Sequence, residues 1–160
     1  MNPGQLLTAA ILPALRLLPL RMDTPAARTM LLAIAYQESA MRHRRQIGGP
    51  ARGYWQFESG GGVRGVLQHP ASKPHIQSVL DSLDYDPAST TAECYALIEH
   101  NDTLAAAFAR LLLWTDAASL PSDADAAWAL YLRTWRPGKP HPGKWSANYL
   151  RAQEVLDVLS

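Results

Sequence analysis

Apolar residues recur at intervals of three and four along most of this chain, which is the spacing that places them on one face of an α-helix. The clearest run follows Asp23-Thr24-Pro25, where Thr24 or Asp23 can cap free backbone amides and the proline suits the first helical position. We therefore expect a helix over residues 25–42. The same spacing predicts helices over 5–20, 74–83, 90–99, 103–116, 123–135 and 145–159.

Glycine and proline separate these helical patterns, and one separation is long. A Gly-Gly-Pro sequence at 48–50 and a Gly-Gly-Gly sequence at 60–62 predict that residues 43–70 form a long loop or a short irregular β-hairpin. The proline-rich segment 136–143 is not expected to be helical. Because 160 residues with 48% hydrophobic content suit one continuous core, the sequence predicts a mainly α, single-domain fold over residues 1–160.

The charge balance of the chain points to no particular partner. Its formal net charge is +1, so no strong field favours nucleic acid or an anionic membrane surface. The apolar stretch 5–20 is interrupted by Pro13, Arg16 and Pro19, is shorter than the roughly 20 residues of a membrane span, and follows no basic region like that of a signal peptide. We expect a buried helix there, with no signal peptide, transmembrane helix or stable membrane insertion.

The cysteine and the histidines give little support to two further enzyme classes. Cys94 is the single cysteine, so it forms no internal disulfide and leaves the redox compartment open. Its position inside a predicted helix is typical of a small core residue rather than of an amidase nucleophile. A metal peptidase would need clustered ligands, but the chain has no His-Glu-x-x-His sequence. The scattered histidines are His43, His69, His75, His100 and His141. We expect no metal and no cofactor.

Glu38 is the candidate catalytic residue. At about 100° per residue it falls within the apolar stripe of the predicted helix 25–42. An inward-pointing carboxylate either finds a cationic partner or has its pKa raised, and a raised pKa keeps the acid protonated near neutrality, ready to donate a proton. An ion pair with Arg42, four residues later, or with a neighbouring arginine is the alternative, and helix geometry alone favours neither.

A glycine-bracketed aromatic turn, residues 53–57, follows this helix. Gly53 allows close backbone approach, Tyr54 and Trp55 offer faces on which sugar rings can stack, and the amide of Gln56 both donates and accepts hydrogen bonds. These groups suit a saccharide site. The alternative is an aromatic turn that closes the core, which is the commoner role for Trp55 or Phe57 taken singly.

A cluster of basic residues lies between the helix and the turn, with no acidic residue from 40 to 57. Its members are Arg42, His43, Arg44, Arg45 and Arg52. These side chains would bind carboxylates of an acidic ligand, or they complement the dipole of the helix C-terminus and are solvated. A nucleic-acid module is disfavoured by the near-zero net charge and the lack of a known motif.

The Glu38-Ser39 pair at a helix end, followed after a loop by Gly53-x-x-Gln56, resembles the lysozyme-like superfamily, in particular lytic transglycosylases, goose-type lysozymes and phage-encoded muramidases. The resemblance covers residues 30–58. The turn at residues 135–138, Trp-Arg-Pro-Gly, also resembles a segment of phage lysozyme-like domains. The family implies a helical domain that cleaves the β-1,4 bond between MurNAc and GlcNAc of peptidoglycan.

The resemblance also implies roles for individual residues. Glu38 would be the catalytic acid/base, Ser39 its orienting neighbour, and Gln56 a group that binds substrate or supports the acid. The family's third motif, Ala-Tyr-Asn with a following glycine, is not reproduced. Tyr131 is its nearest counterpart, on an aromatic helical face shared with Trp128 and Trp135 that borders the cleft or packs in the core. The missing motif leaves an alternative, namely a non-catalytic virion or glycan-binding protein that retains the fold.

Glu58 is the candidate second carboxylate, because ordinary glycosidases use two, the second as nucleophile or as base for water. A lytic transglycosylase works with one acid and gives a 1,6-anhydro product. Glu58 is otherwise a solvated loop residue, so the sequence does not separate a transglycosylase from a hydrolase. The resemblance, the small size and the missing export signal together imply a phage protein of the endolysin kind. Such a protein would be located in the virion or the host cytoplasm, with a virion or holin-type delivery partner.

Overall fold

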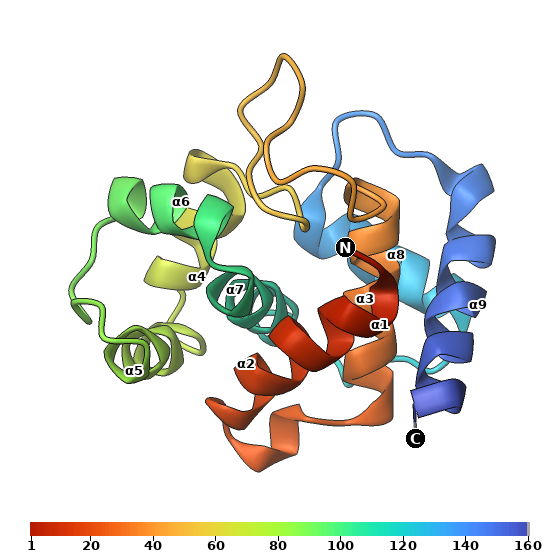
Figure 1. Ribbon diagram of the computed structural model, residues 1–160, viewed down its shortest axis with the longest axis horizontal. Helices are drawn as coiled ribbons and strands as arrows, with labels where there is room; N and C mark the ends of the chain where they lie inside the picture. The colour runs from red at the N-terminus through yellow and green to blue at the C-terminus, as the bar shows by residue number, and fades with distance from the viewer. Residues whose placement is uncertain (160) are drawn as a thin grey trace.

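In the computed structural model, which describes residues 1–159, a buried helix, α7 (Asp102–Trp114), runs through the middle of the structure (Figure 1). Every residue from Leu104 to Leu113 is buried, because apolar side chains cover nearly all sides of this helix. Most of the other helical segments contact it, and the regular structure of the described residues is almost entirely helical, which confirms a mainly α fold. Ser160, the last residue of the predicted domain, lies outside the described residues.

The N-terminal segment forms a continuous helical run that differs from the single helix predicted over 5–20. It consists of α1 (Pro3–Leu6), a π-helical turn η1 (Leu7–Ile11) and α2 (Leu12–Arg16). Pro13 lies in the first turn of α2, and the wider π turn before it accommodates the missing N–H group and the ring. A short 3₁₀ turn, η2 (Leu20–Met22), leads to the next helix. None of the helices within residues 1–159 is long and apolar enough to span a membrane.

Helix α3 (Pro25–Glu38) begins as predicted and ends early. Thr24 caps its first turn through the side chain, and Pro25 occupies the first helical position. The helix was expected to continue to residue 42, but Ala40 and Met41 have φ values of 51° and 58°. This left-handed conformation cannot continue a right-handed helix, so the chain turns away directly after Glu38.

The segment 43–70 is only partly the predicted loop. In residues 1–159 the extended pairing consists of two isolated antiparallel bridges, Arg45 with Arg52 and Arg52 with Phe57. Residues 59–68 are instead helical and form a π-helical turn η3 (Ser59–Val63) followed by α4 (Arg64–Gln68). The glycine run serves packing here, since a Cβ at Gly62 would lie 2.7 Å from Cδ1 of Phe57.

The remaining helices lie close to their predicted positions. They are α5 (Lys73–Ser82), α6 (Thr91–His100), α8 (Ala124–Trp135) and α9 (Pro142–Leu159). Helix α9 starts three residues earlier than predicted, inside the proline-rich segment, because proline is well tolerated at the first position of a helix. It runs alongside α3 (Figure 1), and the two form the most extensive helix pair of the fold.

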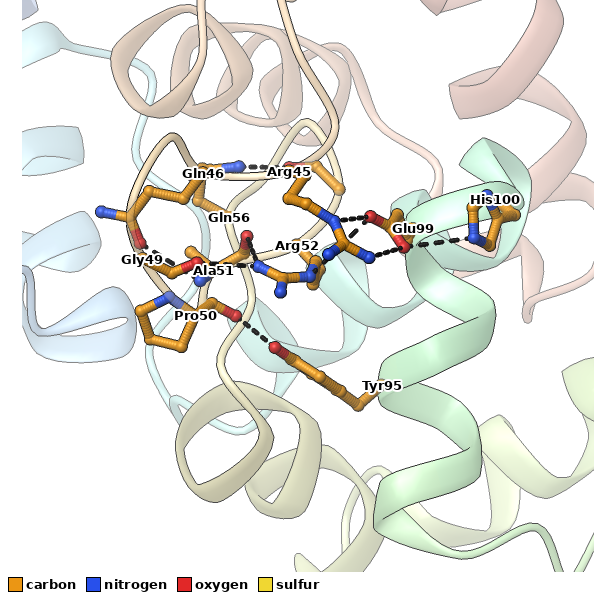
Figure 2. A network of polar contacts seen from close by, with 11 residues as sticks. Arg45, Gln46, Gly49, Pro50, Ala51, Arg52, Gln56, Tyr95, Glu99 and His100 are labelled. Atoms are coloured by element: carbon orange, nitrogen blue, oxygen red, sulfur yellow. Dashed lines mark hydrogen bonds and ion pairs between the residues drawn. The ribbon is translucent and has the colours of Figure 1, made fainter.

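Three arginines fasten the loop after α3 to α6 and α7. Arg44 forms a bidentate ion pair with Asp102, with nitrogen–oxygen distances of 2.9 and 2.8 Å. Arg45 and Arg52 both approach Glu99, and Figure 2 shows this network. Much of the basic cluster is therefore paired with carboxylates more than forty residues away along the chain. The sequence suggested that these arginines bind an acidic ligand or complement the dipole of the preceding helix. Neither role included Glu99 or Asp102 as a partner, because these carboxylates lie on other helices.

Candidate functional site

Glu38 is the last residue of α3, and its side chain is partly buried. The hydroxyl of Tyr131, on α8, donates a hydrogen bond to its Oε1 atom at 2.8 Å. Among the described residues Glu38 forms no ion pair, so the alternative pairing with Arg42 is not formed. The two helices that meet here bring together residues 93 positions apart.

The pKa of Glu38 is raised from 4.5 to about 7. Burial, which disfavours the charged carboxylate, is the largest cause; the hydrogen bond from Tyr131 opposes it, and the negative charge of Glu58 adds to it. Burial and the charge of Glu38 also raise the pKa of Tyr131, so its phenol stays protonated and remains a donor. At neutral pH Glu38 is therefore present in both its protonated and its charged form.

Tyr131 is held in place by aromatic rings of α8 and α9. Its ring stacks on Trp145 at a centroid distance of 5.2 Å and contacts Trp128 at 5.3 Å and Trp135 at 6.3 Å. Such pairs contribute about 0.5–1.5 kcal/mol each beyond area burial. Tyr131 is 2% exposed, so the predicted aromatic face packs mainly in the core. This packing fixes the position of the Tyr131 hydroxyl, which donates the hydrogen bond to Glu38.

The aromatic turn 53–57 belongs largely to the core. Gly53 and Tyr54 are buried and Trp55 is fully inaccessible, which argues against the predicted role of these residues in binding sugar rings. The indole nitrogen of Trp55 donates to the carbonyl of Leu31 on α3 at 2.9 Å. At Gly53, φ is 75° and a Cβ would lie 2.9 Å from Cγ2 of Ile98. Glycine is thus required at position 53 by conformation and by space.

Ser39 and Gln56 hold the turn rather than the acid. The Ser39 hydroxyl donates to the carbonyl of Tyr54 at 2.7 Å and accepts from the N–H of Met41 at 3.1 Å. The Gln56 amide donates to the carbonyl of Gly53 at 2.8 Å. The hydrogen bond that orients the carboxyl of Glu38 comes from α8 instead, so the positioning role expected of Ser39 falls to Tyr131.

A cleft of about 530 Å³ lies between the glycine-rich η3–α4 segment and the end of α8. Glu58 is exposed and lines this cleft. Glu38 is not among the residues that line the cleft, but the charge of Glu58, which does line it, acts on Glu38. Trp135 also lines the cleft and lies one helical turn after Tyr131, the residue that donates a hydrogen bond to Glu38. The partly exposed Trp135 also donates its indole hydrogen to the carbonyl of Trp55 at 2.9 Å.

Sequence patterns give little indication that the polar residues of this cleft belong to a functional site. His69 is one of five scattered histidines, and Asp116 pairs with Arg133 at 3.0 Å from another helix. Trp135 belongs to the predicted aromatic face of Tyr131, and Thr134, three residues after Tyr131, could have been placed near the acid by the same helical periodicity. The thiol of the remaining nucleophile candidate, the buried Cys94, stays protonated, because burial raises its pKa to about 11.

Replacing Tyr131 with phenylalanine is expected to raise the pKa of Glu38 further. The carboxylate then loses the donor that stabilises its charged form, while the burial remains. Carboxyl ¹³C chemical shifts of Glu38 followed during a pH titration measure this change. Tyr149→Phe is the matched control, because Tyr149 contacts the same cluster through Trp145 and should leave the pKa of Glu38 unchanged. An unchanged or lower pKa in Tyr131→Phe would contradict the assigned hydrogen bond.

Comparison of the chain with protein-family models, with curated proteins and with solved structures found no match. The class of the protein is therefore defined by its fold and by the geometry of the candidate site. They describe a mainly helical protein in which a partly buried glutamic acid, fixed by a tyrosine hydroxyl, titrates near neutral pH. A second carboxylate, Glu58, lines a nearby cleft.

Proposed function

We propose that this protein cleaves the β-1,4 bond between MurNAc and GlcNAc of peptidoglycan, with Glu38 as the general acid. The observation that carries the proposal is the pKa of about 7 at Glu38, because it keeps a proton available for transfer at neutral pH. The order of Glu38-Ser39 and Gly53-x-x-Gln56, shared with lysozyme-like enzymes, supports the same chemistry. A phage origin and a virion or holin-type delivery partner belong to this proposal.

In the proposed reaction Glu38 transfers its proton to the glycosidic oxygen as the bond to the sugar breaks. The carboxylate that forms keeps the hydrogen bond from Tyr131, which stabilises the negative charge at that moment. Because only protonated Glu38 can donate, the rate should decrease as the pH rises through about 7.

Two routes complete the reaction. In a transglycosylase, the charged Glu38 then accepts the proton of the sugar's own 6-hydroxyl, and an anhydro product forms. In a hydrolase, Glu58 acts as the second carboxylate and either activates water or attacks the sugar. The charge of Glu58 acts on Glu38, which makes it the carboxylate to test.

The cleft beside Glu58 is the proposed place for the glycan. Its volume of about 530 Å³ lies within the range of about 300–1,000 Å³ that is usual for small-ligand sites. A Cβ at Gly60 or Gly65 would meet no atom within 4 Å, so this wall leaves room for a sugar ring. The partly exposed Trp135 takes over the stacking role that the buried Trp55 cannot perform.

Digestion of purified peptidoglycan by the wild type and by Glu38→Gln tests the proposal. Loss of the general acid is expected to slow the release of muropeptides by about 100-fold or more, while Glu154→Gln, an exposed carboxylate on α9, retains the wild-type rate. Circular dichroism confirms that each variant is folded. Equal rates for Glu38→Gln and the wild type would end the assignment of Glu38 as the acid.

Mass analysis of the released fragments from the same digestion identifies the route. Anhydro ends support the single-acid transglycosylase, and reducing ends support hydrolysis. Loss of hydrolysis in folded Glu58→Gln assigns Glu58 as the second carboxylate, whereas an unchanged rate removes it from the mechanism. Wild-type protein that binds intact peptidoglycan and releases nothing would favour the non-catalytic glycan-binding alternative.

A further inference from the structure

A second cavity, of about 650 Å³, lies at the end of α3 opposite Glu38. The start of α3, the turn η2, the end of α7 and the segment 115–120 surround it. Figure 1 shows α3 leaving the turn after α2 at one end and reaching the long loop at the other. A helix of 14 residues is about 20 Å long, so this cavity is remote from Glu38, although Asp116 lines both this cavity and the cleft beside Glu58.

Arg110, on α7, is the central residue of this cavity. It is 3% exposed, and its Nε atom donates to the carbonyl of Met22 at 2.8 Å. Its Nη1 and Nη2 atoms bind no group within residues 1–159, where no fully buried side-chain nitrogen or oxygen lacks a partner. Neither Nη atom is therefore fully buried, and Arg110 is one of the residues that line the cavity.

Arg110 carries its charge without a carboxylate partner. Burial lowers its pKa to about 10, which still leaves it charged at neutral pH. Asp23 acts on it only through its field, since that carboxylate is paired with Arg28 at 2.7 Å. Asp116 also lines the cavity, and it is paired with Arg133 at 3.0 Å. The buried guanidinium thus presents two unused donors on one edge.

Two further features make this cavity electropositive. Arg21 lines it from η2, and the guanidinium groups of Arg21 and Arg110 both approach the ring of Trp114, at 5.4 and 5.6 Å. The positive end of the α3 dipole lies beside it, because the cap residue Thr24 and Ala26 of the first turn are lining residues. Leu113 and several alanines supply an apolar wall beside these charges.

We propose that this cavity binds a small organic carboxylate, of the kind found at the end of a peptide or in an N-acylated amino acid. The free edge of Arg110 pairs with both carboxylate oxygens, since a guanidinium edge matches the planar carboxylate group. The apolar wall receives the organic part of the ligand. A monoanion suits the cavity better than a phosphate dianion, because the carboxylate residue Asp116 is among the lining residues. This proposal is independent of the reaction proposed at Glu38.

Two-dimensional NMR titration of the full chain with N-acetylalanine, N-acetylalaninamide and inorganic phosphate tests this inference. The Nε–H signal of Arg110 and the indole signal of Trp114 are expected to shift with N-acetylalanine and not with the uncharged amide. Arg110→Met should weaken the binding of N-acetylalanine by about tenfold to hundredfold, as expected for hydrogen bonds to a charged group. Arg21→Ala should weaken it less, and Arg16→Ala, which removes an exposed arginine of α2, should leave it unchanged.

The same titration can overturn the proposal without any variant. Equal binding of N-acetylalanine and its amide would show that the charge is not recognised, and tighter binding of phosphate would exclude a carboxylate site. Should Arg110→Met fail to fold, Arg110→Lys retains the charge and loses the paired donors, so it should also weaken the binding. Undiminished binding of N-acetylalanine by either folded variant would remove Arg110 from the site.

Discussion

Replacing Trp55 with alanine is expected to lower the free energy of unfolding by about 3–5 kcal/mol, the range found when a large buried aromatic side chain is truncated. Trp55 is fully buried, and its indole nitrogen donates to the carbonyl of Leu31 on α3. Its own carbonyl accepts from the indole of Trp135 on α8. The substitution therefore leaves a cavity at a point where the aromatic turn, α3 and α8 meet. Denaturant unfolding followed by circular dichroism measures the loss.

Trp128→Ala is the matched control for this prediction. Trp128 is also a tryptophan of the aromatic cluster, but it is only partly buried, so its truncation should cost less. The comparison decides between two roles of the turn. If Trp55→Ala unfolds like the wild type and loses only the binding of peptidoglycan, Trp55 is an accessible sugar-binding residue, and its assignment to the core is wrong.

The helices could be predicted from the sequence because their signals are local. Thr24 and Pro25 start α3 within one turn of the chain, and the apolar period of 3.6 residues marks its buried face. The end of α3 carries no comparable signal, since Ala40 and Met41 adopt the left-handed conformation without being glycine or asparagine. The turn is instead held through Ser39, whose hydroxyl accepts from the N–H of Met41 and donates to the carbonyl of Tyr54, fifteen residues later.

The candidate site could be predicted only in part, for a similar reason. Helical spacing is enough to place Glu38 on an inward face and Tyr131 on an aromatic one. The hydrogen bond between them depends on how α3 and α8 meet, which no local pattern encodes. The burial of Tyr54 and Trp55 is likewise a tertiary property, since an aromatic turn has the same sequence whether it lines a cleft or fills a core.

Glu38→Gln is expected to stabilise the protein at pH 8 by up to about 3 kcal/mol and to have no effect near pH 4. The unfolded chain releases the proton of Glu38 near pH 4.5, and the folded protein releases it near pH 7. Between these values the folded state binds more protons, so the free energy of unfolding of the wild type falls as the pH rises. Glutamine is neutral throughout and still offers an oxygen to the hydroxyl of Tyr131.

Urea unfolding of the wild type and of Glu38→Gln at pH 4, 6 and 8 measures this difference. The control is Glu154→Gln, which replaces an exposed carboxylate and should change the free energy of unfolding by less than about 0.5 kcal/mol at every pH. A substitution that stabilises the fold above pH 7 and also abolishes cleavage would mark Glu38 as a residue kept for chemistry at a cost in stability. Destabilisation by Glu38→Gln at pH 8 would instead identify Glu38 as a charged structural residue. In that case its raised pKa, and the general-acid role that depends on it, would both be wrong.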